Sequence, residues 1–264
     1  MDQAKINPYD IGLLRGYAVF DVMCTQKGKP FLIDAHWKRF LNSAKELNLK
    51  VPISKKVYIQ LVEKLLKLNG YKKSTVRTIL TGGVSDNGFS HKRGREVFYI
   101  LIEKFCPIPE KIYTQGAGVI TLEHDRFFPG AKITNYVVAV RNQDRKEKAG
   151  ALEIIYIKDK KALEASTSNF FIVKNNKIIT TKNNILLGTT RNLVVDIARK
   201  AGLNIVERDV KASELFFADE MFLTATNKDI VPVVRIDGKR IGSGKVGPAT
   251  KRIMKLFSDF VEKY

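Results

Sequence analysis

Lys132-Ile133-Thr134-Asn135-Tyr136 is the stretch that decides the fold, because two further clusters follow it along the chain. The first cluster is Leu163-Glu164-Ala165-Ser166-Thr167-Ser168-Asn169-Phe170, and the second is Leu187-Gly188-Thr189-Thr190-Arg191. In this order the chain presents a primary amine, a carboxylate, and hydroxyl side chains at a predicted helix start.

These three groups match the chemistry of an aldehyde cofactor. Lysine forms a Schiff base with an aldehyde when desolvation or nearby positive charge keeps its amine neutral. A carboxylate keeps a pyridine nitrogen protonated, and the N–H groups at a helix N-terminus bind phosphate. The sequence therefore predicts pyridoxal phosphate as the cofactor.

Composition limits the possible classes of protein. The chain has 264 residues, of which 44% are hydrophobic, so it can bury one large or two modest cores. No apolar run reaches the roughly 20 residues of a membrane helix, and residues 1–5 resemble neither a secretory signal nor a transit peptide. We therefore expect a cytoplasmic protein without membrane association. No metal site or disulfide framework is expected, because Cys24 and Cys106 stand alone and the histidines are scattered.

The net charge of +19 raises the question of nucleic-acid binding. The lysines are spread along the whole chain, for example at Lys55-Lys56 and Lys72-Lys73, and no zinc finger or aromatic-basic RNA motif accompanies them. A solvated basic surface is the favoured interpretation, so a nucleic-acid partner is not expected. A basic binding protein on a degenerate enzyme scaffold is the alternative from a different class.

The first half of the chain reads as a small α/β domain. The predicted strands are 19–24, 30–33, 75–80 and 97–105. Asp34 is predicted to cap a helix that runs to Leu49, and Ser54 a second helix that ends at Asn69-Gly70. Two prolines in Cys106-Pro107-Ile108-Pro109 oppose both helix and central strand. We therefore place a domain at 1–106 and a linker at 107–116.

The second half, 117–264, reads as a larger domain in which strands outnumber helices. Its predicted strands are 119–122, 153–157, 170–173, 177–180 and 220–224, and its predicted helices are 135–149, 190–201 and 248–260. Many short strands with isolated helices favour an α+β domain with a barrel-like or strongly curved sheet.

The chain resembles the class IV, or fold type IV, aminotransferases that use pyridoxal phosphate. The resemblance rests on the three stretches above and on Gly16-Tyr17-Ala18-Val19-Phe20-Asp21, His36-x-x-Arg39-Phe40 and Gly247-Pro248-Ala249-Thr250. This group contains branched-chain aminotransferases, D-amino-acid aminotransferases and aminodeoxychorismate lyases. It implies a small N-terminal α/β domain, a larger cofactor-binding domain and a homodimer with active sites at the subunit boundary.

The resemblance also implies a role for each site residue. Lys132 would be the Schiff-base lysine that moves the substrate's α-proton, Tyr136 would donate to the cofactor's phenolic oxygen, and Glu164 would face the pyridine nitrogen. The phosphate would be held by Arg39, Thr189, Thr190 and Thr226.

Each of these residues also has an ordinary structural interpretation. Lysines are usually solvated, and Tyr136 could simply pack in the core. Thr189 and Thr190 could cap the following helix, and Arg39 could form an ion pair on a helix face. A rival phosphate motif, Gly242-Ser243-Gly244-Lys245, lacks both the earlier glycine and the Ser or Thr of a P-loop.

Two arginines bear on the substrate. Arg15 and Arg77 stand where a less common subgroup of D-amino-acid aminotransferases, which this chain resembles, clamps carboxylates. Arginine offers a planar, permanently charged fork for a carboxylate, which favours a D-amino acid paired with 2-oxoglutarate. Alternatively, Arg77 pairs with an internal acid such as Asp21 or Glu103.

The predicted substrate-binding residues are Arg15, Arg77, Phe20 and Asn227. The expected reaction moves an amino group between an amino acid and a 2-oxo acid. An L-branched-chain-amino-acid aminotransferase and an aminodeoxychorismate lyase remain the alternatives, because they use the same cofactor and lysine with a different pocket.

Overall fold

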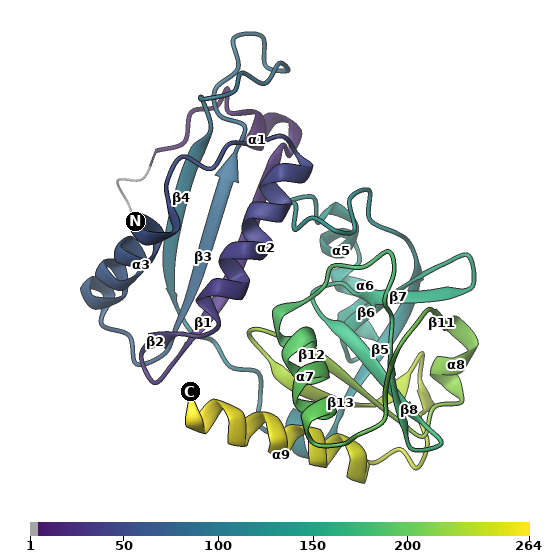
Figure 1. Ribbon diagram of the computed structural model, residues 1–264. Coiled ribbons are helices and arrows are strands. Elements are labelled where there is room, and N and C mark those ends of the chain that lie inside the picture. Colours follow the sequence, from purple (N-terminus) through teal and green to yellow (C-terminus); the bar gives the residue numbers. More distant parts are fainter. Residues whose placement is uncertain (1–4) are drawn as a thin grey trace. The chain divides into compact units, whose positions relative to one another are not determined.

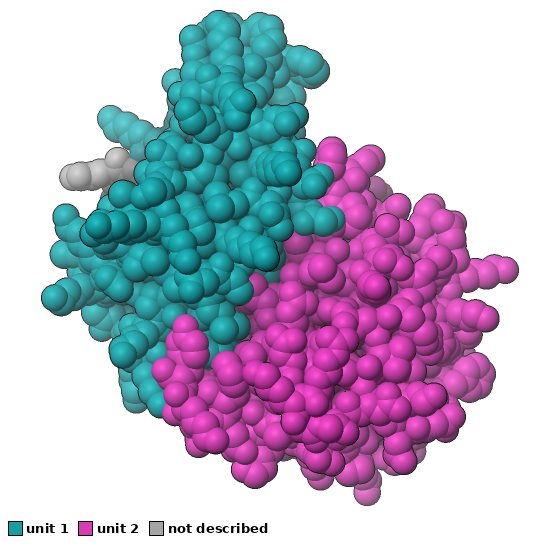
Figure 2. All heavy atoms as spheres, in the orientation of Figure 1, with its two compact units in different colours: residues 1–105, 130–135 teal, residues 106–129, 136–264 magenta. Residues whose placement is uncertain are grey.

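The computed structural model describes residues 5–264, which form two compact units coloured separately in Figure 2. Unit 1 comprises the described residues up to Phe105 together with Gly130–Asn135, and unit 2 comprises Cys106–Pro129 and Tyr136–Tyr264. The first four residues, which entered the expectation about targeting segments, lie outside the described residues. The predicted domain boundary and the linker at 107–116 stay proposals.

Unit 1 is built on a four-stranded antiparallel sheet (Figure 1) with the order β2-β1-β3-β4. Its strands are β1 (Ala18–Gln26), β2 (Lys29–Pro30), β3 (Ser74–Thr81) and β4 (Val97–Lys104), and its helices are α1 (Ile11–Arg15), α2 (Ile33–Glu46) and α3 (Lys55–Asn69). Side chains alternate between the faces of the sheet. Val76 and Leu80 of β3 join the core that contains Trp37 and Phe40 of α2, whereas Arg77 lies on the opposite face.

The two longer helices of unit 1, α2 and α3, start differently from each other. Ser54 caps α3 as predicted, because its hydroxyl accepts a hydrogen bond from Val57 N at 3.3 Å. The prediction that Asp34 caps α2 was wrong: the N-cap is Leu32, which has a left-handed backbone (φ 56°) and no side-chain cap. Asp34 instead forms an ion pair with Lys55 at 2.7 Å. The predicted strand 30–33 is correspondingly cut short, because α2 already begins at Ile33.

Unit 2 contains a ten-stranded mixed sheet with the order β10-β9-β8-β12-β13-β5-β6-β7-β11, and β14 pairs with β13. Its strands are β5 (Ala117–Glu123), β6 (Ala151–Lys158), β7 (Lys161–Ala165), β8 (Asn169–Lys174), β9 (Lys177–Thr180), β10 (Ile205–Glu207), β11 (Val210–Lys211), β12 (Glu220–Ala225), β13 (Asp229–Ile236) and β14 (Lys239–Arg240). Phe170 and Ile172 of β8 and Met221 and Leu223 of β12 lie in its largest core. Consecutive β7 and β8 place Glu164 and Asn169 at the two ends of one short turn.

The helices of unit 2 are α4 (Lys111–Gln115), α5 (Val137–Arg141), α6 (Gln143–Lys148), α7 (Thr189–Lys200), α8 (Ala212–Phe216) and α9 (Pro248–Lys263). The prediction of one helix over 135–149 was wrong, because the helix is interrupted at Asn142, between α5 and α6. Tyr136 is the N-cap of α5 and stands just outside the helix. No helix within residues 5–264 is long and apolar enough to cross a lipid bilayer.

Candidate active site

Lys132 lies in the short segment of unit 1 that runs alongside β1. Its backbone N–H donates to the Ser43 hydroxyl at 2.9 Å, and its carbonyl accepts from Phe20 N at 2.9 Å. Ile133 forms an isolated antiparallel bridge with Val19. The Lys132 ammonium lies 4.6 Å from the centre of the Phe20 ring. The backbone on both sides of Lys132 is thus fixed by hydrogen bonds, and the side-chain amine lies beside the ring of Phe20.

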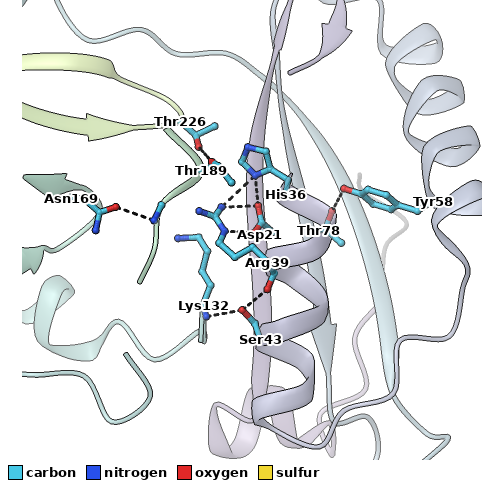
Figure 3. A network of polar contacts seen from close by, with 11 residues as sticks. Asp21, His36, Arg39, Ser43, Tyr58, Thr78, Lys132, Asn169, Thr189 and Thr226 are labelled. Atoms are coloured by element: carbon cyan, nitrogen blue, oxygen red, sulfur yellow. Dashed lines mark hydrogen bonds and ion pairs between the residues drawn. The ribbon is translucent and has the colours of Figure 1, made fainter. Parts of the chain in front are cut away.

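A buried polar network lies next to this segment in unit 1 and consists of Asp21, His36 and Arg39 (Figure 3). The Asp21 carboxylate accepts from Arg39 Nε at 2.7 Å and from Arg39 Nη2 at 2.9 Å, and it lies 2.6 Å from His36 Nδ1. This bidentate contact fixes the plane of the guanidinium. Within residues 5–264, no group accepts from Arg39 Nη1, so this edge can bind an external anion.

The charge states in this network follow from its burial. Burial alone would raise the pKa of Asp21, but Arg39 and His36 outweigh it and hold the pKa well below its usual range. For His36, burial lowers the pKa and opposes the effect of Asp21, while Arg39 and Lys132 lower it further. At neutral pH the network therefore combines an ionised carboxylate, a neutral imidazole and a guanidinium cation.

Glu164 is a buried carboxylate of unit 2, with 4% of its surface exposed. Its Oε2 atom accepts from Leu186 N at 3.3 Å and from Asn169 Nδ2 at 3.4 Å, and its Oε1 atom lies 3.0 Å from Arg126 Nε. Asn169 also donates to Leu186 O at 2.9 Å. Asn169 therefore links the carboxylate to the loop that leads into α7.

Tyr136 shares its partner with Glu164. Arg126 Nη1 donates to the Tyr136 hydroxyl at 3.3 Å, and the guanidinium carbon lies 5.2 Å from the centre of the Tyr136 ring. Sequence reasoning missed Arg126, because no local motif marks a lone arginine among the many basic residues of this chain. Its proximity to Tyr136 in the sequence, ten residues away, was the only available signal.

The start of α7 has the features of an anion cradle. Thr189 and Thr190 are buried at its first two positions, and within residues 5–264 no side chain caps the helix at Gly188. A Cβ atom at Gly188 would lie 2.3 Å from Asn169 Oδ1, whereas the existing Gly188 N–H donates to that oxygen at 3.2 Å. The hydroxyls of Thr189 and Thr226 lie 3.5 Å apart (Figure 3). The first N–H groups of a helix have no acceptor within it, so this end can bind a phosphate.

A second buried network, which the sequence did not reveal, joins two loops of unit 2. Lys228 donates to Glu153 and, at 2.8 Å, to the Thr167 hydroxyl. Glu153 also accepts from the hydroxyls of Ser166, Thr167 and, at 2.9 Å, Ser168. Burial raises the pKa of Glu153, but Lys228 and the hydroxyl donors outweigh it and lower the pKa to about 2. The network thus ties the turn between Glu164 and Asn169 to the loop that carries Thr226.

The predicted substrate residues have different environments. Phe20 is half-buried beside Lys132, whereas Arg15, at the end of α1, and Asn227 are exposed. Arg77 forms an ion pair with Glu103 through Nε at 3.2 Å and Nη2 at 3.1 Å. The structure thus shows one of the two acids that were considered as internal partners for Arg77.

The predicted cofactor residues fit pyridoxal phosphate by chemistry. Unit 1 supplies a fixed lysine and an oriented arginine, and unit 2 supplies a buried carboxylate, a tyrosine hydroxyl and a helix start with hydroxyl residues. The absence of a side chain at Gly188 lets the backbone approach a phosphate closely. Among residues 5–264, no three His, Cys, Asp or Glu side chains gather so as to hold a metal ion.

Comparison with known proteins agrees with this chemistry. The family model described as "Amino-transferase class IV" matches residues 18–236. A provisionally named branched-chain-amino-acid aminotransferase of Methanocaldococcus jannaschii is 32% identical over 99% of this chain and 93% of its own length. The D-alanine aminotransferase of Bacillus licheniformis is 31% identical over 98% of this chain and 93% of its own length.

Solved structures agree at the level of the fold and the cofactor. A T.th. branched-chain amino acid aminotransferase, solved with pyridoxamine 5'-phosphate, superposes with a TM-score of 0.90 at 27% identity, covering 99% of this chain and 90% of that chain. The expected α+β fold of type IV, with a curved sheet in the larger part, is confirmed by this likeness.

Proposed function

Because this chain belongs to the class IV aminotransferase family, we propose that it moves an amino group between an amino acid and a 2-oxo acid in two half-reactions centred on Lys132. The family uses pyridoxal phosphate, so the cofactor expected from the sequence is confirmed. The observation that carries the proposal is the fixed backbone of Lys132, held on both sides by Ser43 and Phe20.

When bound, pyridoxal phosphate supplies an electron sink for the bonds at the substrate's α-carbon. Lys132 would hold the cofactor through its amine, and once the substrate's amino group has displaced that amine, the released amine would take the proton from the α-carbon. The aromatic face of Phe20 keeps water from one side of this amine, which favours proton transfer to carbon. Tyr136 would donate to the cofactor's phenolic oxygen, and Glu164 would hold the proton on its ring nitrogen.

We assign the phosphate to Arg39 and to the start of α7. Arg39 presents Nη1 while Asp21 occupies its other edge, so the guanidinium is oriented before the anion arrives. The N–H groups at the start of α7, with the hydroxyls of Thr189, Thr190 and Thr226, supply the remaining donors. Asn169 keeps this loop in place through Gly188 N and Leu186 O.

For the substrate we favour a D-amino acid together with 2-oxoglutarate. Arg15 and Arg77 each offer a guanidinium for a carboxylate, and a dicarboxylate 2-oxo acid needs two such groups. Phe20 and Asn227 complete this set of substrate-binding residues. Arg15, exposed at the end of α1, serves the active site of a second copy in a homodimer.

A second candidate, an L-branched-chain-amino-acid aminotransferase, is favoured by two observations. The guanidinium of Arg77 is already paired with Glu103, which lowers its capacity to bind a carboxylate of the substrate. Phe20 beside Lys132 also suits an apolar side chain.

Substitution of the lysine tests the reaction. Purified Lys132→Ala, incubated with pyridoxal phosphate and then desalted, is expected to lose the visible absorption band and the transaminase activity of the wild type. Lys148→Ala, on the exposed side of α6, is the matched control and should retain both. A coloured and active Lys132→Ala enzyme would refute the assignment of Lys132.

Single half-reactions distinguish the substrates. The holoenzyme is mixed with D-alanine, D-glutamate or L-leucine, and bleaching of the visible band is followed over time. The D-amino-acid proposal expects rapid bleaching by the first two substrates alone, and rapid bleaching by L-leucine alone supports the second candidate. Pyruvate release from aminodeoxychorismate without any 2-oxo acid would instead indicate a lyase.

A further inference from the structure

Arg126 contacts both residues proposed to hold the cofactor ring, and no motif had marked it. Only 12% of its side chain is exposed. Its Nε atom lies 3.0 Å from Glu164 Oε1, Nη1 donates to the Tyr136 hydroxyl at 3.3 Å, and Nη2 donates to Ser166 O at 2.9 Å. The guanidinium also faces the rings of Tyr136 at 5.2 Å and Tyr156 at 5.9 Å. All of these groups belong to unit 2.

The contact with Tyr136 sets the direction of a hydrogen bond. Arginine has only donors, whereas a tyrosine hydroxyl has one donor and can also accept. Tyr136 must therefore accept from Arg126, and its own proton is directed toward a different acceptor. A phenolic oxygen of the cofactor ring is an acceptor of this kind. Arg126 thus selects the hydroxyl orientation that the proposed role of Tyr136 requires.

The contact with Glu164 is electrostatic. The N–H of Arg126 Nε is buried without a hydrogen-bond partner within residues 5–264, although the Nε atom lies within ion-pair distance of Glu164 Oε1. The donors to Glu164 Oε2, Leu186 N and Asn169 Nδ2, are at 3.3 and 3.4 Å, which is long for such bonds. A cation beside the carboxylate therefore contributes to its position and favours its ionised form.

We propose that Arg126 is a positioning residue that sets the hydroxyl direction of Tyr136 and the ionised state of Glu164, and thereby the binding and protonation of the cofactor ring. The proposal rests on the proposed function, because it assigns the ring to these two residues. One guanidinium then acts on both sides of the same ring, at the nitrogen and at the phenolic oxygen.

The ionisable groups around Arg126 come from several elements. Tyr136 precedes α5, Glu164 lies on β7 and Tyr156 lies on β6. Burial raises the pKa of Tyr156 to about 12, and Arg126 opposes this shift without outweighing it. His124 and Asp125 directly precede Arg126 along the chain, and Glu153 acts on Tyr156 from within β6. Tyr156 therefore stays neutral at the pH values at which the enzyme is tested.

The experiment uses the holoenzyme and two substitutions of Arg126. Arg126→Met removes the charge and approximately retains the side-chain volume. Arg126→Lys retains the charge but lacks the planar guanidinium group. Arg208→Met, which breaks the surface pair with Glu214, is the matched control. Two quantities are measured without substrate: the dissociation constant of pyridoxal phosphate, and the pH midpoint of the visible band. Circular dichroism identifies variants that do not fold.

For Arg126→Met we expect about 10- to 100-fold weaker cofactor binding, by analogy with the loss of groups that orient the ligands of a metal ion. Loss of a nearby cation favours the protonated form of the cofactor, so the pH midpoint should rise by about one unit or more. Arg126→Lys should restore part of the midpoint shift, and Arg208→Met should change neither quantity. In a Tyr136→Phe background, Arg126→Met should shift the pH midpoint less than it does in the wild type, because the hydroxyl through which Arg126 acts is absent.

A folded Arg126→Met enzyme with the wild-type dissociation constant and pH midpoint would overturn the proposal, as would full additivity with Tyr136→Phe. If Arg126→Met does not fold, Arg126→Lys decides the question. A folded Arg126→Lys enzyme with the wild-type pH midpoint and cofactor affinity would mean that the role of Arg126 is purely structural. Failure of the proposed function appears separately, because it requires Lys132→Ala to retain the visible band and the activity.

Discussion

At the scale of single residues, the sequence identified the groups that carry chemistry but not those that orient them. Lys132, Glu164 and Thr189 stand in ordered local motifs, and local motifs can be read directly from a sequence. Arg126 and Lys228 were missed, because their partners are brought to them by folding; Lys228 and Glu153 are 75 residues apart along the chain. A buried ion pair leaves no periodic pattern in sequence.

Gly188 permits a prediction at this scale. In Gly188→Ala, the new Cβ would lie 2.3 Å from Asn169 Oδ1, while the backbone φ of −63° is ordinary, so the effect is a pure side-chain clash. Asn169 must move, which disturbs its bonds to Leu186 and Glu164. We expect the free energy of unfolding to fall by about 1–3 kcal/mol and the affinity for pyridoxal phosphate to decrease. Chemical denaturation and equilibrium dialysis measure the two effects.

Gly118→Ala in β5 is the matched control, since its Cβ would meet Gly150 O at an ordinary 3.5 Å. It should leave the cofactor affinity unchanged. Wild-type stability and affinity in Gly188→Ala would show that Asn169 can move away without consequence.

At the scale of elements, strong local signals gave the right element and competing signals gave the wrong boundary. The Ser54 cap and Asn69-Gly70 defined α3, which ends with Gly70 in a left-handed conformation. β13 escaped prediction because Pro232 opposes a central strand. In the sheet, Pro232 is paired with Phe222 of β12 and lies one residue ahead of Val233, where pairing with β5 begins. Asp34 failed as a cap because the chain already turns at Leu32.

The pair Glu153–Lys228 permits a prediction about the loops between elements. In Lys228→Met, a buried carboxylate loses its cation, and breaking a buried ion pair from one side costs about 3–5 kcal/mol. The double variant Glu153→Gln/Lys228→Met removes the uncompensated charge and should recover most of this loss. Urea unfolding of both variants gives the free energies.

The surface pair Lys174–Asp219 supplies the control for this comparison. Both of its side chains are well exposed, so Lys174→Met should change the unfolding free energy by less than about 1 kcal/mol. Because the folded pKa of Glu153 is lowered to about 2, its contribution is present above pH 4.5 and is lost as the pH falls toward 2. Equal unfolding free energies for Lys228→Met and the wild type at neutral pH would contradict the role of the pair.

At the scale of the whole molecule, the family and the cofactor follow from motifs spread over nearly the whole chain, and the substrate does not. The two arginines predicted to bind the substrate, Arg15 and Arg77, illustrate why. Arg77 has an internal partner in Glu103, and Arg15 is exposed, so the use of either by a substrate depends on groups that one chain does not fix. The relatives named above likewise include both branched-chain and D-alanine aminotransferases.

The proposed homodimer permits a prediction that involves two copies of the chain. If Arg15 acts in the partner's active site, Arg15→Ala and Lys132→Ala chains should each be impaired alone but complement each other when mixed. In the hybrid, the site with the intact Lys132 receives Arg15 from the Lys132→Ala chain, so one of its two sites is complete. Refolding an equimolar mixture should therefore restore about a quarter of the wild-type activity, because random pairing makes about half of the dimers hybrids.

Arg39→Ala mixed with Lys132→Ala supplies the matched control for this experiment. Arg39 is fixed by Asp21 of its own chain and lies in the same unit as Lys132, so we place both residues in the same active site. This mixture should give no recovery, because neither site of the hybrid regains both residues. No recovery in the Arg15→Ala mixture would place Arg15 within its own active site or outside the site altogether, and would remove the support that Arg15 gives to a dicarboxylate substrate. Recovery in the Arg39→Ala mixture would instead contradict the placement of Arg39 and Lys132 in one active site.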